Sequence, residues 1–278
     1  MAVKRNGTTK DKNGLIKQRY LCHGCGRRFN DLTGTALAYS KKQELWGQMA
    51  RCMVEGKSVR KTAQALDVHV ATAFAWRHKL LDAHREQEKP TLTGIVETDE
   101  MYLLHSMKGS RRVGETGRKS RRRGGVATKR GLSKEQVCLV VSQDRHQQSL
   151  AEISGMGMPS AIAVHQVLTQ MVHKEAILCT DGAQPYRRYC QEAEIQHVPV
   201  DGKKRLKGSL YHLNNVNNWH KRFRDWHNVG LRGVATKYLL NYTTWFIFLD
   251  QARKMSQVPA ARQMLVTACS AFGERPAA

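Results

Sequence analysis

Gly94-Ile-Val-Glu-Thr-Asp-Glu-Met-Tyr102 sets the fold class, because it is a β-like run that carries three acids. The two-residue period of a strand puts Glu97 and Asp99 on one face and Glu100 on the other. In Ala176-Ile-Leu-Cys-Thr-Asp-Gly182, Asp181 again directly follows a short buried strand. Each acid alone is explained by a turn at the end of a strand. Together, carboxylates at the ends of neighbouring strands can hold two divalent ions roughly 4 Å apart, as in phosphoryl transfer.

Strands and helices alternate on both sides of these two segments, through the interval 89–255. Strands are predicted at 95–103, 137–142, 149–154, 176–180 and 197–200, and helices at 161–172, 186–193, 214–226 and 235–255. Strands first, followed by strand and helix alternation, predict a mixed α/β layer fold for this interval. The last residues, 256–278, are predicted to form a C-terminal tail.

The charge of the chain predicts a polyanionic partner. Its 278 residues include 46 Lys+Arg and 23 Asp+Glu, for a formal net charge of +23. Release of counterions from a phosphate backbone favours binding by such a protein. Ten of the basic residues lie at 108–130, within a basic insertion, 108–131, that has too few apolar residues to bury itself. Arg121, Arg122 and Arg123 in this insertion are candidate phosphate contacts.

A cytoplasmic protein is expected, with no membrane partner. The longest apolar stretches, such as 245–249, are far shorter than the roughly 20 residues of a membrane span. The basic N-terminus is not followed by the apolar region of a secretory signal. The seven cysteines, an odd number, fit a reducing compartment better than a disulfide framework.

Residues 41–88 are predicted to form a helix-turn-helix DNA-binding module. Apolar residues recur at helical spacing from position 45, Ser58 is placed to cap a second short helix, and a third helix begins near Val70. Ala63 is small enough for a close helix crossing, and Thr72, Arg77 and Lys79 are predicted to face a DNA groove. The alternative is an ordinary three-helix unit with a basic surface.

Residues 1–40 form a small, loop-rich segment around Cys22-His-Gly-Cys25. A closed structural zinc site needs four ligands, and a zinc ribbon supplies a second cysteine pair some 15 to 20 residues away. No second pair lies near this one. The segment therefore has the composition of half a zinc ribbon, and Cys22 and Cys25 alone do not predict a closed zinc site.

Taken together, these features resemble a known family: bacterial insertion-sequence transposases with an ISXO-like, DDE-type catalytic domain. The resemblance covers almost the whole chain, and the order of its motifs is specific. The motifs are Arg19-Tyr-Leu-Cys-His-Gly-Cys-Gly-Arg-Arg-Phe-Asn30 with Thr33-Gly-Thr35, Thr72-Ala-Phe-Ala-Trp-Arg-His78, Val96-Glu-Thr-Asp-Glu100, Thr180-Asp-Gly182, Asn214-Asn-Val-Asn-Asn-Trp-His220, and Gly233-Val-Ala-Thr-Lys-Tyr-Leu239 followed by Asn241-Tyr242.

The family resemblance implies a ribonuclease H-like mixed sheet with flanking helices, preceded by a small helix-turn-helix and a partial zinc ribbon. By motif position, Asp99 and Asp181 match the first two metal-binding carboxylates, and the metal is Mg²⁺ or Mn²⁺. The third ligand position falls at Asn217, 36 residues after Asp181, where a subgroup of the family carries Asn. An amide offers a carbonyl oxygen to a metal but no negative charge, so weaker metal binding than with Glu is expected.

Further positions enter through the same resemblance. His220, one turn beyond Asn217, and Glu100 are candidate neighbours of the site. Lys237 in the Gly233 motif is a candidate phosphate contact. Zn²⁺ would belong to Cys22 and Cys25, but family members generally carry a further cysteine pair ahead of the segment that begins here at Lys4.

The predicted function is therefore that of a DNA transposase, which cleaves and joins DNA at the terminal inverted repeats of an insertion sequence by metal-assisted phosphoryl transfer. Its partners would be the terminal repeats, the target DNA and further copies of the chain in a synaptic complex, at the nucleoid of a bacterial cytoplasm. One alternative is a catalytically inactive DNA-binding remnant or regulator, which is supported by Asn217 and the half ribbon. An RNA-binding protein is the other, and it leaves the two strand-end acids without a role.

Overall fold

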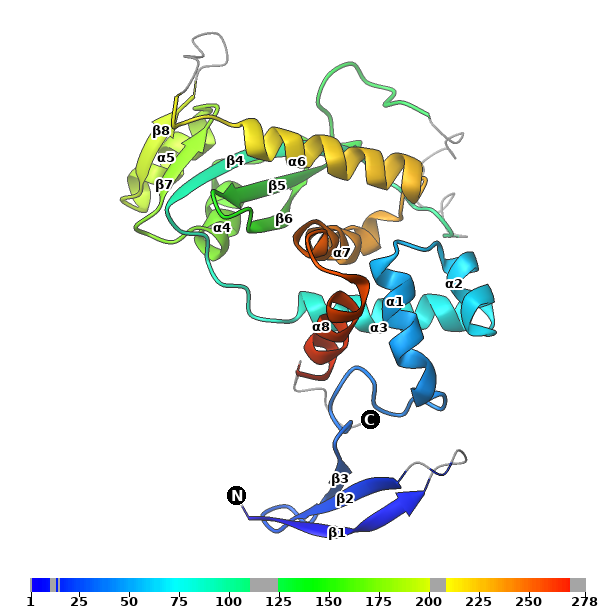
Figure 1. Cartoon of the computed structure of the whole chain (residues 1–278). Helices are drawn as coiled ribbons and strands as arrows, with labels where there is room; N and C mark the ends of the chain where they lie inside the picture. The colour runs from blue at the N-terminus through cyan, green and yellow to red at the C-terminus, as the bar shows by residue number, and fades with distance from the viewer. Residues whose placement is uncertain (1, 11–13, 15, 111–124, 201–208, 271–278) are drawn as a thin grey trace. The chain divides into compact units, whose positions relative to one another are not determined.

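The computed structural model describes residues 2–10, 14, 16–110, 125–200 and 209–270 (Figure 1). They divide into two compact units. One contains the residues up to Gln87 together with those from Met255 onward, and the other runs from Glu88 to Lys254. Among the described residues, none of the helices is both long and apolar enough to cross a membrane.

The Glu88–Lys254 unit is built on a mixed five-stranded sheet. Its strands are β4 (Ile95–Leu104), β5 (Gln136–Asp144), β6 (Ser149–Met156), β7 (Ile177–Thr180) and β8 (Gln196–Pro199). They lie in the order β6-β5-β4-β7-β8, where β4, β5 and β6 pair antiparallel and β7 and β8 continue the sheet in parallel with β4. The predicted mixed α/β class is confirmed.

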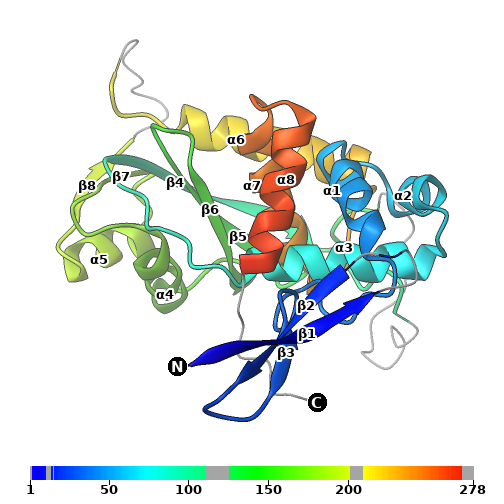
Figure 2. The ribbon, with the colours of Figure 1, turned by 60° about the horizontal axis from the view of Figure 1, so that its bottom comes forward.

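Helices cover both faces of this sheet. They are α4 (Ala161–Met171), α5 (Gln184–Glu192), α6 (Asn214–Asp225) and α7 (Leu239–Ala252). In Figure 2, α4 and α5 lie on one side of the sheet and α6 on the other. A π-helical turn, Trp226–Gly230, follows α6, and a short 3₁₀ turn, Thr236–Tyr238, precedes α7. The predicted helix at 235–255 is therefore shorter than expected at both ends.

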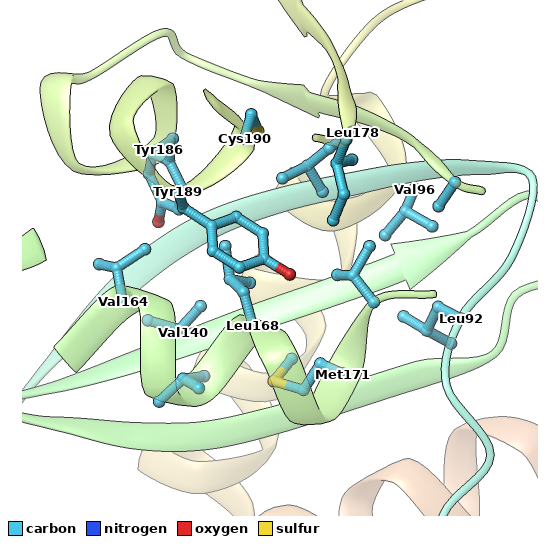
Figure 3. Packing of buried hydrophobic residues seen from close by; sticks show 14 of the residues in the cluster. Leu92, Val96, Val140, Val164, Leu168, Met171, Leu178, Tyr186, Tyr189 and Cys190 are labelled. Atoms are coloured by element: carbon cyan, nitrogen blue, oxygen red, sulfur yellow. The ribbon is translucent and has the colours of Figure 1, made fainter. Parts of the chain in front are cut away.

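The alternation of side chains along β4 sorts the core into two layers. Val96 packs with apolar residues of α4 and α5, the cluster shown in Figure 3. Met101 and Leu103 pack instead with residues of α6 and α7. On α6, Trp219 and Phe223 are fully buried, and each large buried side chain contributes roughly 1.5 to 3 kcal/mol. The same alternation fixes which helix each acid of β4 faces.

The other unit contains the helices α1 (Trp46–Val54), α2 (Val59–Leu66), α3 (Val70–Arg85) and α8 (Gln257–Ser270), after a 3₁₀ turn at Gln43–Leu45. Ser58 caps α2 by accepting a hydrogen bond from the Lys61 amide. His69, in place of the usual hydroxyl or carboxylate, caps α3 by accepting from the Ala71 amide at Nδ1. Helices α1, α2 and α3 form where the sequence predicts them.

Helix α8 is the main departure from the predicted organisation. It occupies most of the interval 256–278, for which a tail is predicted, and it packs against α1 and α3. Ala260, Ala261, Met264 and Ala268 are buried because they recur on one face of the helix. The small residues allow close approach to α1. Residues 271–278 lie outside the described part of the chain.

A separate antiparallel sheet forms the start of the chain, from β1 (Val3–Lys10), β2 (Ile16–Cys22) and β3 (Arg28–Asn30). Tyr20 and Phe29 stack across β2 and β3 with ring centroids 5.4 Å apart. Cys22 ends β2, and the chain then turns through Cys25 before β3 begins. The Cys22–Cys25 turn therefore lies at one end of this small sheet.

Candidate active site

Parallel pairing of β4 and β7 brings the two predicted acids together. Val96 pairs with Leu178 and Glu97 with Cys179, the last pair between these strands. Asp99 and Asp181 each lie two residues beyond this pair, and the charge of Asp181 acts on Asp99, so the two acids lie near each other. Asp181 follows β7 directly and is exposed. The sequence predicted two acids at neighbouring strand ends, and the strand register supplies their proximity.

The charges at this edge of the sheet are unbalanced. Burial raises the pKa of Asp99 to about 7, and the charges of Glu100 and Asp181 add to the effect. Burial also raises the pKa of Glu100, with a further contribution from Asp181. His220 Nδ1 lies 3.7 Å from Asp99 Oδ2, but burial and Arg224 lower the pKa of His220 to about 4. Near pH 7 His220 is neutral, so it leaves the charge of Asp99 uncompensated.

Glu97, two residues before Asp99 on the same face of β4, has abundant partners. It is 0% exposed. Its Oε2 accepts from the Asn215 amide at 2.8 Å and from the Val216 amide at 3.2 Å, and its Oε1 accepts from Asn215 Nδ2 at 2.8 Å. Arg145 Nη1 donates to Oε1 at 2.6 Å, and His212 Nδ1 lies 3.1 Å away. Glu97 therefore fastens the N-terminus of α6 to the strand that carries Asp99.

The role of Glu97 escaped the sequence-based reasoning, which placed it on the Asp99 face but gave it no function. A signal was available. An acid inside a predicted strand is buried, and a buried carboxylate requires donors. The donors themselves come from segments 48 and 118 residues away in sequence, and no local pattern links them to β4.

Helix α6 presents His220 to Asp99 and carries Asn217 one turn earlier. Asn217 is exposed, on the same side of the helix as His220 because residues three apart lie one above the other. Its amide donates to the Leu213 carbonyl at 3.1 Å. In the described parts of the chain, no hydrogen bond joins the Asn217 side chain to Asp99 or Asp181.

The loop that follows β7 is tightly built. Asp181 Oδ1 accepts from the Ala183 amide at 2.9 Å. Gly182 has a φ of +78°, and a Cβ there would lie 2.9 Å from Pro199 Cβ, so only glycine fits. The Nε group of Arg187 donates to the Gly182 carbonyl at 2.6 Å. The sequence-based reasoning identified Gly182 as a turn residue but missed Arg187.

Similarity to known proteins identifies the family of this chain. The ISXO2-like transposase domain family matches residues 91–249, more than half of the chain and nearly all of the five-stranded unit. The chain belongs to this transposase family.

Two individual proteins are similar as well. A protein described as "Uncharacterized protein in transposable element ISH50", from Halobacterium salinarum, is 26% identical over 257 residues, which are 91% of this chain and 85% of the relative. The structure titled "Crystal structure of a pre-cleavage Mos1 transpososome" aligns with 81% of this chain and 77% of its own, at 10% identity and a TM-score of 0.31. That TM-score is too low to establish a common fold.

The predicted DNA contacts of the transposase have different surroundings. Arg77 does not lie on the outer face of α3, as was expected, because its side chain is 1% exposed and donates to the Lys57 carbonyl and to Thr62 Oγ1. It bonds α3 to α2 and to the turn before it. Thr72 and Lys79 are half-buried.

Two further sets of predicted phosphate contacts lie in the transposase domain. Arg121, Arg122 and Arg123 fall outside the described residues. Lys108, at the start of the basic insertion, donates through Nζ to the Gly233 carbonyl at 2.6 Å. Lys237 is exposed, with Nζ 4.8 Å from the centroid of the Tyr238 ring.

Cys22 and Cys25 lie close together. Hydrogen bonds from the backbone and side chain of Cys25 lower the pKa of the Cys22 thiol. Within the described ranges, no three or more His, Cys, Asp or Glu side chains form a ready-made metal site. The pair therefore supplies at most half of a closed zinc site.

The chemistry of the acids fits a hard divalent cation. Asp99 and Asp181 offer carboxylate oxygens, which magnesium prefers. Burial is the main cause of the raised pKa of Asp99, and the charges of Glu100 and Asp181 raise it further, so a bound cation would favour the ionised form. Asn217, on the adjacent helix, could add a carbonyl oxygen from the third ligand position of the motif.

Proposed function

We propose that this transposase cleaves DNA at the terminal inverted repeats of an insertion sequence and joins the freed ends to a target, with Asp99 and Asp181 as its catalytic carboxylates. The observation that carries the proposal is the parallel pairing of β4 and β7, because Asp99 and Asp181 each lie two residues beyond its last pair in a transposase-family domain. The strand order β6-β5-β4-β7-β8, three antiparallel strands extended by two parallel ones, supports a ribonuclease H-like fold.

The residues of the site would divide the work as follows. Asp99, Asp181 and the amide oxygen of Asn217 would hold Mg²⁺ or Mn²⁺. When bound, such a cation activates a water or hydroxyl and stabilises the leaving oxygen in phosphoryl transfer. Glu97 holds α6 so that Asn217 and His220 stay on the Asp99 side. His220 is neutral near pH 7, so it adds no positive charge next to the metal ligands.

The DNA would be held by parts of the chain outside this site. Thr72 and Lys79 on α3, Lys237, and the basic insertion with Arg121, Arg122 and Arg123 are the proposed contacts. Arg77 is withdrawn from this set because its guanidinium is buried. Phosphate contacts of this kind position DNA without reading its sequence. Two ends must be joined, so we expect several copies of the chain to act together, in the cytoplasm at the nucleoid.

A catalytically inactive DNA-binding protein is the second candidate. Two observations favour it: Asn217 replaces a carboxylate, and the described residues contain no cluster of three metal-ligating side chains. In that case the raised pKa of Asp99 would be a remnant of a former metal site.

A strand-cleavage assay on DNA from the ends of the element, with Mg²⁺ or Mn²⁺, separates the two candidates. Wild type is expected to nick this DNA, while Asp99→Asn and Asp181→Asn reduce nicking to background and still bind. Asp31→Asn, which changes an exposed acid of the N-terminal sheet region, serves as the control. If wild type binds the DNA but is as inert as both site variants, the enzymatic function is refuted. Unchanged nicking in Asn217→Ala would remove Asn217 from the site.

A further inference from the structure

Arg187, on the first turns of α5, lies against the loop that carries Asp181. Its Nε group donates to the Gly182 carbonyl at 2.6 Å, so one edge of the guanidinium is fixed to the backbone next to the acid. Its Nη2 atom lies 3.1 Å from the position that a Cβ on Gly182 would occupy. The guanidinium therefore lies over Gly182.

Gly182 makes room for this arrangement. Its φ of +78° is unfavourable for other residues, and a side chain there would meet Pro199 on one side at 2.9 Å and the Arg187 guanidinium on the other. The loop is thus shaped so that Arg187 can close over it. A longer or differently turned loop would place the same arginine elsewhere.

Within the described part of the chain, the remaining donors of Arg187 have no acceptor. Its side chain is exposed, and among the described residues its only hydrogen-bond acceptor is the Gly182 carbonyl, which Nε uses. Arg188, the next residue on α5, differs: its Nε donates to Glu192 Oε1 at 2.7 Å in an ion pair one helical turn away. Two neighbouring arginines of equal charge therefore differ in whether their donors are free.

Arg187 also lies within electrostatic reach of the site. Burial lowers the pKa of His197, the charge of Arg187 lowers it further, and Asp181 acts in the opposite direction. His197 Nε2 lies 2.9 Å from Thr180 Oγ1, at the end of β7. A cation at this place offsets the repulsion that Asp99, Glu100 and Asp181 exert on an approaching phosphate.

We propose that Arg187 binds a backbone phosphate of DNA beside Asp181, through a fork of two N–H donors. With Nε fixed to the Gly182 carbonyl, both Nη groups are held in one plane, which matches two oxygens of a phosphodiester. The contact holds the strand at the carboxylates in register for cleavage. The inference rests on the proposed function in one respect, that DNA enters the site at Asp181.

The test is a binding measurement that needs no cleavage. Fluorescent duplexes from the ends of the element are titrated in EDTA against wild type, Arg187→Gln, Arg187→Lys and the matched control Arg188→Gln. A second series of duplexes carries one uncharged methylphosphonate in place of a single phosphate, moved stepwise across the cleavage region. Each Kd is measured at several salt concentrations.

Arg187→Gln is expected to weaken binding roughly 10-fold and to reduce the salt slope by about 1, as for one lost phosphate contact. Arg188→Gln should change Kd less than about twofold, since its charge is already paired. One methylphosphonate position should weaken wild type by the same factor and have no further effect in Arg187→Gln. Arg187→Lys should restore part of the salt slope but not the affinity, because lysine lacks the fork.

Two outcomes overturn the contact. If every methylphosphonate acts equally on wild type and Arg187→Gln, Arg187 contacts no phosphate and serves the loop alone. Equal losses of DNA affinity in Arg187→Gln and Arg188→Gln would mean that each arginine contributes only its positive charge and no specific contact. Cleavage of the unmodified duplex with Mg²⁺ is scored separately. If one methylphosphonate position depends on Arg187 but no cleavage occurs, the contact is supported and the proposed reaction is refuted. If cleavage occurs but no methylphosphonate position depends on Arg187, only the contact is refuted.

Discussion

Glu97 and Asp99 lie two residues apart on the same face of β4, in opposite electrostatic surroundings. Glu97 is 0% exposed and accepts four hydrogen bonds, from Arg145, from both nitrogens of Asn215 and from the Val216 amide. Asp99 is 24% exposed at its side chain, with neutral His220 and the acids Glu100 and Asp181 around it. Every oxygen of the Glu97 carboxylate is occupied by donors, whereas Asp99 has the Glu100 amide as a donor and two acids beside it.

This difference separates a structural acid from a candidate ligand. A buried charge is tolerated where donors satisfy it, as at Glu97. At Asp99 the Glu100 amide is a donor, but burial and the neighbouring acids outweigh it, and the pKa rises. Saturation at Glu97 also leaves no free oxygen for a metal, so the two acids cannot exchange roles although they share a strand and a face.

Removal of the saturated carboxylate is expected to have the largest effect on stability. Glu97→Ala removes the carboxylate that pairs with Arg145 and accepts from Asn215 and the Val216 amide, which costs about 3 to 5 kcal/mol in the free energy of unfolding. Asp99→Ala, the matched change two residues away, should cost far less and become stabilising at pH 8. Urea denaturation of both variants measures the difference. Equal losses would mean that the two acids have the same structural role.

Asp99 should make stability depend on pH. Its pKa rises from an ordinary value of 3.8 to about 7 in the folded protein, so between these values the native state binds more protons than the unfolded state. Stability is therefore lost as pH rises from about 4 to about 7, by up to about 4 kcal/mol from this group.

Thermal unfolding in EDTA across that pH range measures the effect. His220, whose pKa is lowered from 6.5 to about 4, contributes with the opposite sign between these values, so the wild-type slope is the sum of both groups. The effect of Asp99 is therefore measured as the Tm of wild type minus the Tm of Asp99→Asn, which should fall as pH rises from about 4 to about 7 because the amide does not titrate. Glu97→Gln is the control, and its pH slope should match wild type even if its Tm is lower. A Tm difference between wild type and Asp99→Asn that does not change with pH would show that Asp99 does not titrate in this range.

Much of this site follows from local sequence pattern. The period of β4 gives the faces of Glu97, Asp99 and Glu100, and the apolar run before Asp181 gives the second strand. The register that brings Asp99 near Asp181 is a property of the sheet, and no residue near either acid encodes it. A topology is needed before the two acids can be placed together.

The sequence does not show which group a side chain will contact in the folded protein. Arg77 sits among basic residues on a helix that is predicted to face DNA, yet it satisfies the Lys57 carbonyl, 20 residues earlier. That need arises only when α3 packs against α2. For α8 a signal existed, because Ala260, Met264 and Ala268 recur every four residues, but small residues give a weak apolar stripe.

Magnesium should stabilise the protein only through Asp99 and Asp181. At a concentration ten times its Kd, a ligand that binds only the folded state adds about 1.4 kcal/mol. The expected rise in Tm at pH 7.5 should disappear in Asp99→Asn and in Asp181→Asn. It should persist in Arg188→Gln, a surface control. The same rise in Asp99→Asn as in wild type would show that magnesium binds elsewhere.

The smallest expected effect concerns Asn217, which shares a side of α6 with His220. If the Asn217 side chain reaches the cation held by Asp99, Asn217→Asp adds a charge to the ligand set and lowers the magnesium midpoint several-fold. Asn218→Asp is the matched control, because Asn218 is also exposed but lies about 100° further round the helix. Tm is followed during a Mg²⁺ titration of both variants. A lower midpoint in Asn217→Asp alone places this side chain at the metal, whereas equal shifts in both variants reduce its effect to general charge and leave Asp99 and Asp181 as the only ligands with support.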